Sequence, residues 1–156
     1  MRSNSIVNVH QDVYPGPHWA CSSTAEDQDT RTARKKKRVI IIDDDALIAE
    51  SLADILNGEG FEATAVLSGR DAIEWARKTQ PDVIVSDVVM PEMNGIEAAK
   101  FIREFLPQCR IILFSGQALT NNLLAEAKAQ GHTFEMLAKP VNPYSLIAAL
   151  RSKSEQ

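Results

Sequence analysis

Residues 39–45 read Val-Ile-Ile-Ile-Asp-Asp-Asp, and this stretch decides the fold. A continuous β-branched run is typical of a strand that is buried on both faces, as in a parallel sheet. Three carboxyl groups follow the run directly, and Asp45 is placed to cap a helix. The stretch therefore predicts a buried strand, an acidic turn and a helix in succession.

The alternation of strand and helix continues to about residue 153. Four more apolar runs predict strands over 61–67, 83–85, 110–114 and 134–138. Apolar residues at helical spacing predict five helices, which lie after Asp45, over 68–79, over 95–106, around Leu119, Leu123, Leu124 and Ala127, and after Asn142-Pro143. This order predicts an α/β fold with a five-stranded parallel sheet, doubly wound so that helices cover both faces.

Composition and charge are uneven along the 156 residues. Residues 1–37 lack a strand or helix period, which predicts a disordered or loosely attached N-terminal tail, a domain over 38–153 and a short C-terminal tail over 154–156. Residues 1–38 carry seven basic and four acidic side chains, whereas residues 39–156 carry ten basic and seventeen acidic ones. The acidic domain is a poor match for nucleic acid and a good match for a cation.

Targeting signals and structural cysteines are not recognisable in the sequence. No apolar run reaches the roughly 18 residues of a membrane span, and the N-terminus has no secretory pattern. Cys21 and Cys109 have neither zinc-site nor disulfide spacing. We therefore expect a cytoplasmic protein without a membrane partner.

Chemically reactive side chains follow four of the five predicted strands. Asp43 and Asp44 follow the first strand, Asp87 the third, Ser115 the fourth and Lys139 the fifth. Because functional groups collect at the carboxyl ends of strands in an open α/β sheet, we expect these side chains to converge on one rim. Crowded carboxylates without nearby His or Cys favour Mg²⁺ or Mn²⁺, and a cation there would draw in a phosphoryl group. Asp87 is then the candidate nucleophile, forming an acyl phosphate.

Four motifs together resemble the receiver domains of two-component response regulators, the CheY-like superfamily. They are the stretch over 39–45, Ser-Asp-Val-Val-Met-Pro-Glu-Met-Asn-Gly over 86–95, Phe-Ser-Gly over 114–116 and Ala-Lys-Pro over 138–140. Each follows its predicted strand, and the resemblance covers residues 38–153. It implies a flavodoxin-like fold with the strand order 2-1-3-4-5.

The resemblance also implies a role for each site residue. Asp87 would accept a phosphoryl group from a histidine kinase or a histidine phosphotransfer protein, and Lys139 would pair with that group. Mg²⁺ would be held by Asp43, Asp44, Asp87 and the backbone carbonyl of Val89, and Ser115 would take the switch role of a Thr or Ser. The Lys139–Pro140 peptide bond is expected to be cis.

Such a domain is a phosphoacceptor rather than an enzyme, and it signals by contact with a downstream protein or by phosphorelay. We expect a stand-alone regulator; the alternative is a receiver fragment of a longer transcriptional regulator, and a homodimer stays open. A phosphatase of the haloacid-dehalogenase type is a further alternative, because Asp43 and Asp45 satisfy an Asp-x-Asp pattern. Asp87 and the Met90-Pro91 pair would then be unexplained.

Three positions carry separate expectations. Relatives often place Tyr or Phe three residues before the lysine, where this chain has Met136, and Phe134 is a candidate substitute. Val89 offers no side chain to orient an attacking water, which predicts slow self-dephosphorylation. Gly95 is expected in a turn that requires a positive φ.

Overall fold

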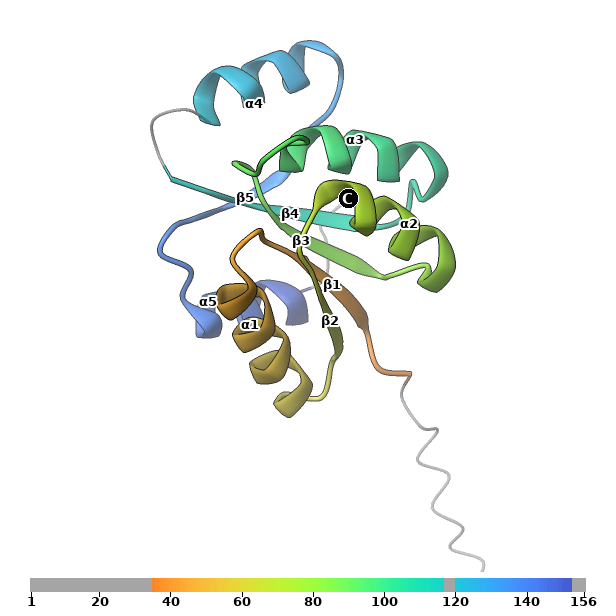
Figure 1. Ribbon diagram of the computed structural model, residues 1–156, viewed down its shortest axis with the longest axis vertical. Helices are drawn as coiled ribbons and strands as arrows, with labels where there is room; N and C mark the ends of the chain where they lie inside the picture. The colour runs from red at the N-terminus through yellow and green to blue at the C-terminus, as the bar shows by residue number, and fades with distance from the viewer. Residues whose placement is uncertain (1–34, 117–119, 153–156) are drawn as a thin grey trace, which may run out of the picture. The chain divides into compact units, whose positions relative to one another are not determined.

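The structure, a computed structural model, describes residues 35–116 and 120–152. Its central sheet has five strands in the order β2-β1-β3-β4-β5, and all four pairs are parallel (Figure 1). The strands are β1 Arg38–Ile42, β2 Glu62–Val66, β3 Val83–Asp87, β4 Arg110–Ser115 and β5 Glu135–Ala138. The predicted fold class and strand order are confirmed.

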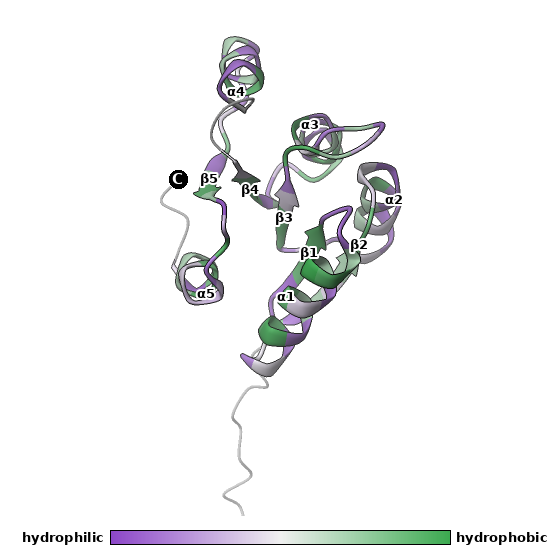
Figure 2. Cartoon of the chain, turned by 60° about the vertical axis from the view of Figure 1, so that its left-hand side comes forward, coloured by the Kyte–Doolittle hydropathy of each residue, from purple (hydrophilic) through white to green (hydrophobic). Residues whose placement is uncertain are grey.

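Five helices cover the two faces of this sheet (Figures 1 and 2). They are α1 Ala46–Gly58, α2 Gly69–Thr79, α3 Gly95–Phe105, α4 Thr120–Ala129 and α5 Pro143–Arg151. Helices α1 and α5 lie on one face, and α2, α3 and α4 lie on the other. The fourth helix was predicted to include Leu119, which lies outside the described residues.

Alternation along the strands divides the core into two layers. Ile40 and Ile42 of β1 pack with side chains from α2 and α3, whereas Val39 and Ile41 pack with side chains from α1 and α5. All four are at most 2% exposed. The β-branched run is therefore buried on both faces, which is why it reads as an unbroken apolar stretch.

Short polar side chains begin most of the helices. The carboxylate of Asp45 accepts hydrogen bonds from the backbone N–H groups of Leu47 and Ile48, and the Ser68 hydroxyl accepts one from the N–H of Asp71. Asn142 caps α5, with Pro143 in the first turn. These three predicted caps are confirmed, and Asn94 adds a capping box at the start of α3.

The amino-terminal edge of the sheet is held by basic side chains. Lys37 donates through Nζ to the carbonyl oxygen of Leu150 at 2.7 Å, and the guanidinium of Arg38 donates to the carbonyl of Thr79. The backbone N–H of Arg38 donates to the carboxylate of Asp82 at 2.8 Å. Lys37 belongs to the predicted tail, of which residues 1–34 lie outside the described part, as does the predicted tail over 154–156. Lys37 and Arg38 thus fasten the ends of α5 and α2 to the sheet.

Gly95 does not occupy the turn conformation that the sequence suggested. Among the described residues, positive φ angles are found at Gly60, Gln80, Glu92 and Gly131. A Cβ atom on Gly95 would lie 1.9 Å from the carbonyl oxygen of Asp87. The glycine is needed because the start of α3 approaches the end of β3 closely, so the expectation of a positive φ is wrong.

No helix in the described ranges is long and apolar enough to cross a membrane.

Candidate functional site

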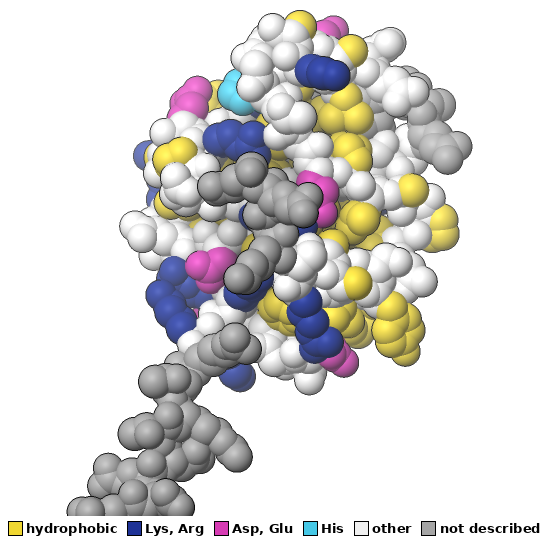
Figure 3. Space-filling view, turned by 180° about the vertical axis from the view of Figure 1, so that it is seen from behind, with side chains coloured by type: hydrophobic (Ala, Val, Ile, Leu, Met, Phe, Trp, Pro, Cys, Tyr) yellow, Lys and Arg dark blue, Asp and Glu magenta, His cyan; other side chains and the backbone are white. Residues whose placement is uncertain are grey.

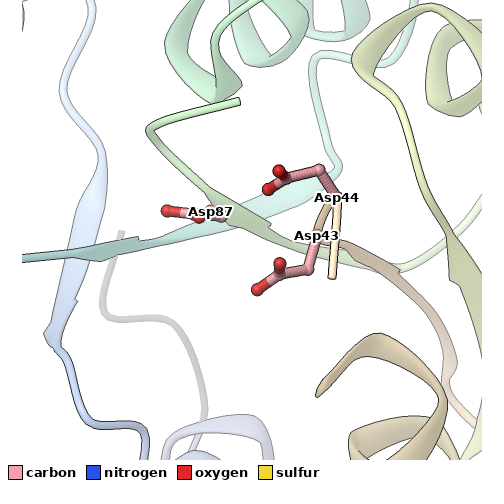
Figure 4. A group of neighbouring side chains, drawn as sticks. All are labelled: Asp43, Asp44 and Asp87. Atoms are coloured by element: carbon pink, nitrogen blue, oxygen red, sulfur yellow. The ribbon is translucent and has the colours of Figure 1, made fainter. Parts of the chain in front are cut away.

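Strand ends bring the predicted site residues to the carboxyl edge of the sheet. Asp43 and Asp44 follow β1, Asp87 ends β3, Ser115 ends β4, and Lys139 follows β5. Carboxylate oxygens of the three aspartates lie within 4.8 Å of one another, and Figure 4 shows the three side chains extending to the same side. The convergence arises because neighbouring parallel strands all end at one edge.

Asp43 is a buried carboxylate with one satisfied oxygen. Its Oδ1 accepts a hydrogen bond from the backbone N–H of Asp45 at 2.9 Å, and the residue is 2% exposed. Its Oδ2 is also buried and has no hydrogen-bond partner within the described ranges, although Nζ of Lys139 lies 3.9 Å away. An orphaned buried oxygen of this kind is costly unless a further cation or donor reaches it.

Burial raises the pKa of Asp43 above its ordinary value of 3.8. The hydrogen bond from Asp45 and the charge of Lys139 act in the opposite direction, while the charges of Asp87 and Asp44 raise the pKa further. The folded protein therefore disfavours the ionised form of this carboxyl group.

Asp87 has a different partner for each carboxylate oxygen. Oδ1 accepts a hydrogen bond from the backbone N–H of Val89 at 3.2 Å, and Oδ2 lies 2.7 Å from Nζ of Lys139. The residue is 6% exposed. Its carboxylate is thus oriented from two sides while it remains at the edge of the sheet.

The three aspartates offer a donor set that suits a hard divalent cation. Their oxygens are carboxylate oxygens, and Asp44 is exposed whereas Asp43 and Asp87 are buried. Mg²⁺ keeps part of its water shell and needs few protein oxygens, so an open, acidic edge fits it better than a closed cage. The unpartnered Oδ2 of Asp43 strengthens this fit.

Ser115 and Lys139 come from adjacent strands β4 and β5. The backbone N–H of Lys139 donates to the Ser115 carbonyl at 2.9 Å, and the Lys139–Pro140 peptide bond is cis, as expected. The Ser115 hydroxyl donates to the carbonyl of Gly116 at 3.3 Å. Both side chains are partly exposed at the same edge as the aspartates.

Three further positions carried predictions, namely Val89, Met136 and Phe134; Val89 follows β3 at this edge, whereas Phe134 precedes the first residue of β5. Val89 is 53% exposed. Met136 and Phe134 both pack against the layer that includes α3, and the Phe134 ring lies under the guanidinium of Arg103 at 4.7 Å. Phe134 therefore already has a cationic partner, and which of the two residues takes part in switching stays a prediction.

Two residues beside the site, Asp45 and Ser86, differ in how well the sequence predicted them. The carboxylate of Asp45 is used by the first turn of α1, so it is not available as the second acid of an Asp-x-Asp site. The sequence interpretation gave Ser86 no role, although it lies fully buried beside Asp87. A polar residue at the end of an otherwise apolar strand was the available signal.

Comparisons with known proteins agree with this arrangement. The family model for the response regulator receiver domain matches residues 39–151. The chain is 36% identical over 113 residues to the chemotaxis protein CheY of Thermotoga maritima, which covers 72% of this chain and 92% of that protein. It is 30% identical over 112 residues to the DNA-binding response regulator MtrA of Mycobacterium tuberculosis, covering 70% of this chain. The chain spans about half the length of that relative, 47%.

Solved structures of receiver proteins have the same fold as this chain. Chemotaxis protein CheY4 of Vibrio cholerae superimposes with a TM-score of 0.66 at 31% identity, over 74% of this chain and 97% of that one. A receiver domain protein from Clostridium thermocellum gives a TM-score of 0.66 at 25% identity, over 73% of this chain and 90% of that one.

Proposed function

The chain belongs to the response regulator receiver domain family, and on that premise we propose that Asp87 accepts a phosphoryl group from a histidine kinase or a histidine phosphotransfer protein. One observation carries the proposal. The ammonium of Lys139 lies 2.7 Å from a carboxylate oxygen of Asp87, beside two further aspartates whose oxygens are within 4.8 Å. Acid and base side chains from three strands thus meet around one candidate acceptor.

The proposed step is an in-line displacement at phosphorus. An oxygen of the Asp87 carboxylate forms the new P–O bond, the P–N bond to the donor imidazole breaks, and the imidazole nitrogen keeps the electron pair. The donor imidazole carries a proton on its other ring nitrogen and so leaves as neutral histidine, and the product on this chain is an acyl phosphate. One phosphoryl group is transferred per chain, so the domain acts as a phosphoacceptor and not as an enzyme with multiple turnover.

Asp43, Asp44, Asp87 and the backbone carbonyl of Val89 would hold Mg²⁺ in this site. When bound, the cation would neutralise carboxylate charge and the negative charge on the transferring phosphoryl group. The unpartnered Oδ2 of Asp43 and the oxygen-only donor set support this assignment.

Lys139 and Ser115 would hold the phosphoryl oxygens after transfer. Lys139 already pairs with Asp87, so a phosphoryl group on Asp87 would take over part of that ion pair. The Ser115 hydroxyl has a weak partner in Gly116 and could rotate toward a new acceptor oxygen. Their movement would bias the loops after β4 and β5 between two states.

A groove beside Lys139 supports docking of the phosphoryl donor. It has a volume of about 650 Å³ and lies between α1 and the segment that leads into α5. Leu47 and Ile48 on its α1 side are 75% and 40% exposed. Apolar side chains exposed next to a reactive edge suit a protein partner. The residues lining the groove are Leu47, Ile48, Ser51, Leu52, Ile55, Lys139, Pro140, Val141 and Pro143.

Output would use the face formed by α4, β5 and α5, where Figure 3 shows hydrophobic side chains gathered. A hollow there, lined by Leu124, Met136 and Leu137 among others, borders Ser115. We propose a cytoplasmic regulator that signals through a downstream protein or a phosphorelay. The second candidate is the receiver part of a longer transcriptional regulator, which is supported by the match to about half of MtrA.

The test is labelling with acetyl phosphate in the presence of Mg²⁺. Intact-mass measurement should show one phosphoryl group per chain, and peptide mapping should place it on Asp87. Asp87→Asn should abolish labelling, whereas Asp54→Asn, which alters an exposed carboxylate on α1, should not. Full labelling of the Asp87 variant, or repeated turnover of p-nitrophenyl phosphate by the unaltered chain, would refute the proposal.

A further inference from the structure

Ser86 is a fully buried hydroxyl next to the proposed acceptor. Three polar or charged residues are buried within the described ranges, namely Asp43, Ser86 and Asp87. The two aspartates belong to the site, which leaves Ser86, at 0% exposure, without a role. Because a buried hydroxyl costs free energy unless it is hydrogen-bonded, its partner is informative.

That partner is the backbone of the acceptor itself. Oγ of Ser86 donates to the carbonyl oxygen of Asp87 at 2.9 Å. Side chains alternate along β3, so Ser86 shares a face with Ile84, which packs in the layer with α2 and α3. The hydroxyl therefore holds the Asp87 carbonyl from the side of the sheet that faces α3.

The two successive peptide units that flank Val88 are both fixed by hydrogen bonds. The N–H of Val88 donates to the carbonyl of Phe114 at 3.1 Å, and the Val88 carbonyl accepts from the N–H of Gly95 at 2.9 Å. The next N–H, that of Val89, donates to Oδ1 of Asp87 at 3.2 Å. A rotation of the peptide unit between Asp87 and Val88 would move both the Asp87 carboxylate and the Val89 backbone.

We infer that Ser86 is a positioning residue for phosphoryl acceptance: through the Asp87 carbonyl, its hydroxyl fixes the peptide unit that aims the Asp87 carboxylate and the Val89 backbone. The inference rests on the proposed function of Asp87. The Ser86 hydroxyl bonds the Asp87 backbone and not its carboxylate, so its contribution lies in orienting the groups that would hold the phosphoryl group and the cation.

A simpler explanation is that only a small residue fits here. A Cβ on Gly95 would lie 2.7 Å from the Ser86 hydroxyl oxygen, so α3 and β3 are in close contact at this point. Alanine would satisfy that steric demand as well as serine does. A comparison of Ser86→Ala with the unaltered chain therefore separates the hydroxyl from the small size of the side chain.

The primary readouts are Mg²⁺ affinity by isothermal titration calorimetry and the amide resonance of Val89 by NMR, both without phosphoryl donor. Ser86→Ala should weaken Mg²⁺ binding by about tenfold, as is usual when a hydrogen bond that orients a ligating carboxylate is lost. The Val89 amide resonance should move, and the rate of labelling by acetyl phosphate should fall. The thiol of Ser86→Cys is a weak donor of similar size, so the Mg²⁺ affinity and labelling rate of this variant should lie between those of Ser86→Ala and the unaltered chain.

Ser68→Ala is the matched control, because this serine caps α2 and its hydroxyl exchanges hydrogen bonds with Asp71 in the first turn of that helix. It should lower the urea midpoint and leave Mg²⁺ affinity unchanged. The inference would be overturned if Ser86→Ala bound Mg²⁺ with the affinity of the unaltered chain and its Val89 amide resonance did not move. If Ser86→Ala fails to fold, the same two results in Ser86→Cys would overturn the inference. Failure of the unaltered chain to be labelled would instead count against the proposed function, since neither primary readout involves phosphoryl transfer.

Discussion

Nζ of Lys139 lies 2.7 Å from Oδ2 of Asp87, so the proposed acceptor is already paired with a cation in this structure. The same ammonium is 3.9 Å from the orphaned Oδ2 of Asp43. One positive charge is thus shared by two buried carboxylates. A cation that binds the aspartates would compete with Lys139 for these oxygens, so the proposed phosphoryl partner would also regulate metal affinity.

Replacing Lys139 by Gln should therefore have opposite effects on binding and on chemistry. Mg²⁺ should bind more tightly, by roughly tenfold or about 1.4 kcal/mol, because the site loses a competing positive charge. Labelling of Asp87 by acetyl phosphate should slow by at least about tenfold, because a donor to the phosphoryl oxygens is missing. Calorimetry and timed labelling measure the two effects.

Lys100→Gln is the matched control for this prediction, because Lys100 lies on α3 and its Nζ bonds Gln130. Neither Mg²⁺ affinity nor labelling should change in that variant. Weaker Mg²⁺ binding in the Lys139 variant would show that the ammonium supports the metal site instead of competing with it.

The buried carboxyl of Asp43 should make stability depend on pH. Burial raises the pKa of Asp43, so between its ordinary pKa of 3.8 and the raised value the folded state binds more protons than the unfolded chain. Its contribution to the free energy of unfolding therefore falls as pH rises through this window, and the loss persists at higher pH. Asp43→Asn should be more stable than the unaltered chain at pH 7 without Mg²⁺, by an amount that shrinks toward pH 4, as measured by urea unfolding.

Mg²⁺ should reverse that order of stability. At a concentration of a hundred times Kd, a ligand that binds only the folded state stabilises it by about 2.7 kcal/mol. The unaltered chain should gain this amount and Asp43→Asn clearly less, since the variant lacks a ligating charge. An Asp43→Asn variant that is less stable at pH 7 in the presence of EDTA would contradict the assignment of a raised pKa.

Gly95→Ala should disrupt the site through the backbone. The added Cβ would meet the Asp87 carbonyl oxygen at 1.9 Å, a contact that only a displacement of α3 or of the end of β3 can relieve. We expect a loss of about 3 kcal/mol in unfolding free energy and loss of Asp87 labelling. Gly58→Ala serves as the control, since a Cβ there would meet nothing within 4 Å. That helical variant should be neutral or more stable by up to about 1 kcal/mol.

The exposed apolar side chain of Val89 should make the acyl phosphate long-lived. It cannot orient an attacking water, so the phosphorylated chain should lose its label over minutes or longer. Val89→Gln introduces an amide that can hold a water, and should speed hydrolysis roughly tenfold. Leu47→Gln, another exposed apolar residue at the same edge, should leave the rate unchanged. The measurement is the decay of radiolabel after removal of the donor; a half-life of seconds in the unaltered chain would contradict the prediction.

The sequence predicted the fold well because buried parallel strands leave a strong pattern. The run over 39–42 and the caps Asp45, Ser68 and Asn142 indicated where strands end and helices begin. The strand ends were predicted less accurately: β2 and β5 are shorter than predicted, and β4 extends to Ser115. The last residue of a strand is decided by backbone hydrogen bonds to the neighbouring strands. The hydropathy of the sequence does not show where those bonds stop.

The sheet topology predicted that the candidate site residues meet at one edge, but it did not predict the contacts between their side chains. That Asp43, Asp44, Asp87 and Lys139 share an edge could be expected, because each follows a strand of one parallel sheet. That Oδ2 of Asp43 is orphaned depends on side-chain geometry. The sequence analysis also missed the close approach at Gly95 and the buried hydrogen bond of Ser86. Both depend on the distance between the start of α3 and the end of β3, which the sequence does not record.

The bond between Lys37 and Leu150 places the beginning and the end of the described domain at one edge, away from the acidic rim. A short linker could therefore join residue 152 to residue 35, and new termini could be opened in the exposed α1–β2 turn at Gly60, which lies at the same edge. Such a circular permutant would interrupt none of the strands whose ends carry the three aspartates and the lysine, so it should keep the proposed phosphoacceptor chemistry in a chain whose ends lie elsewhere on the domain.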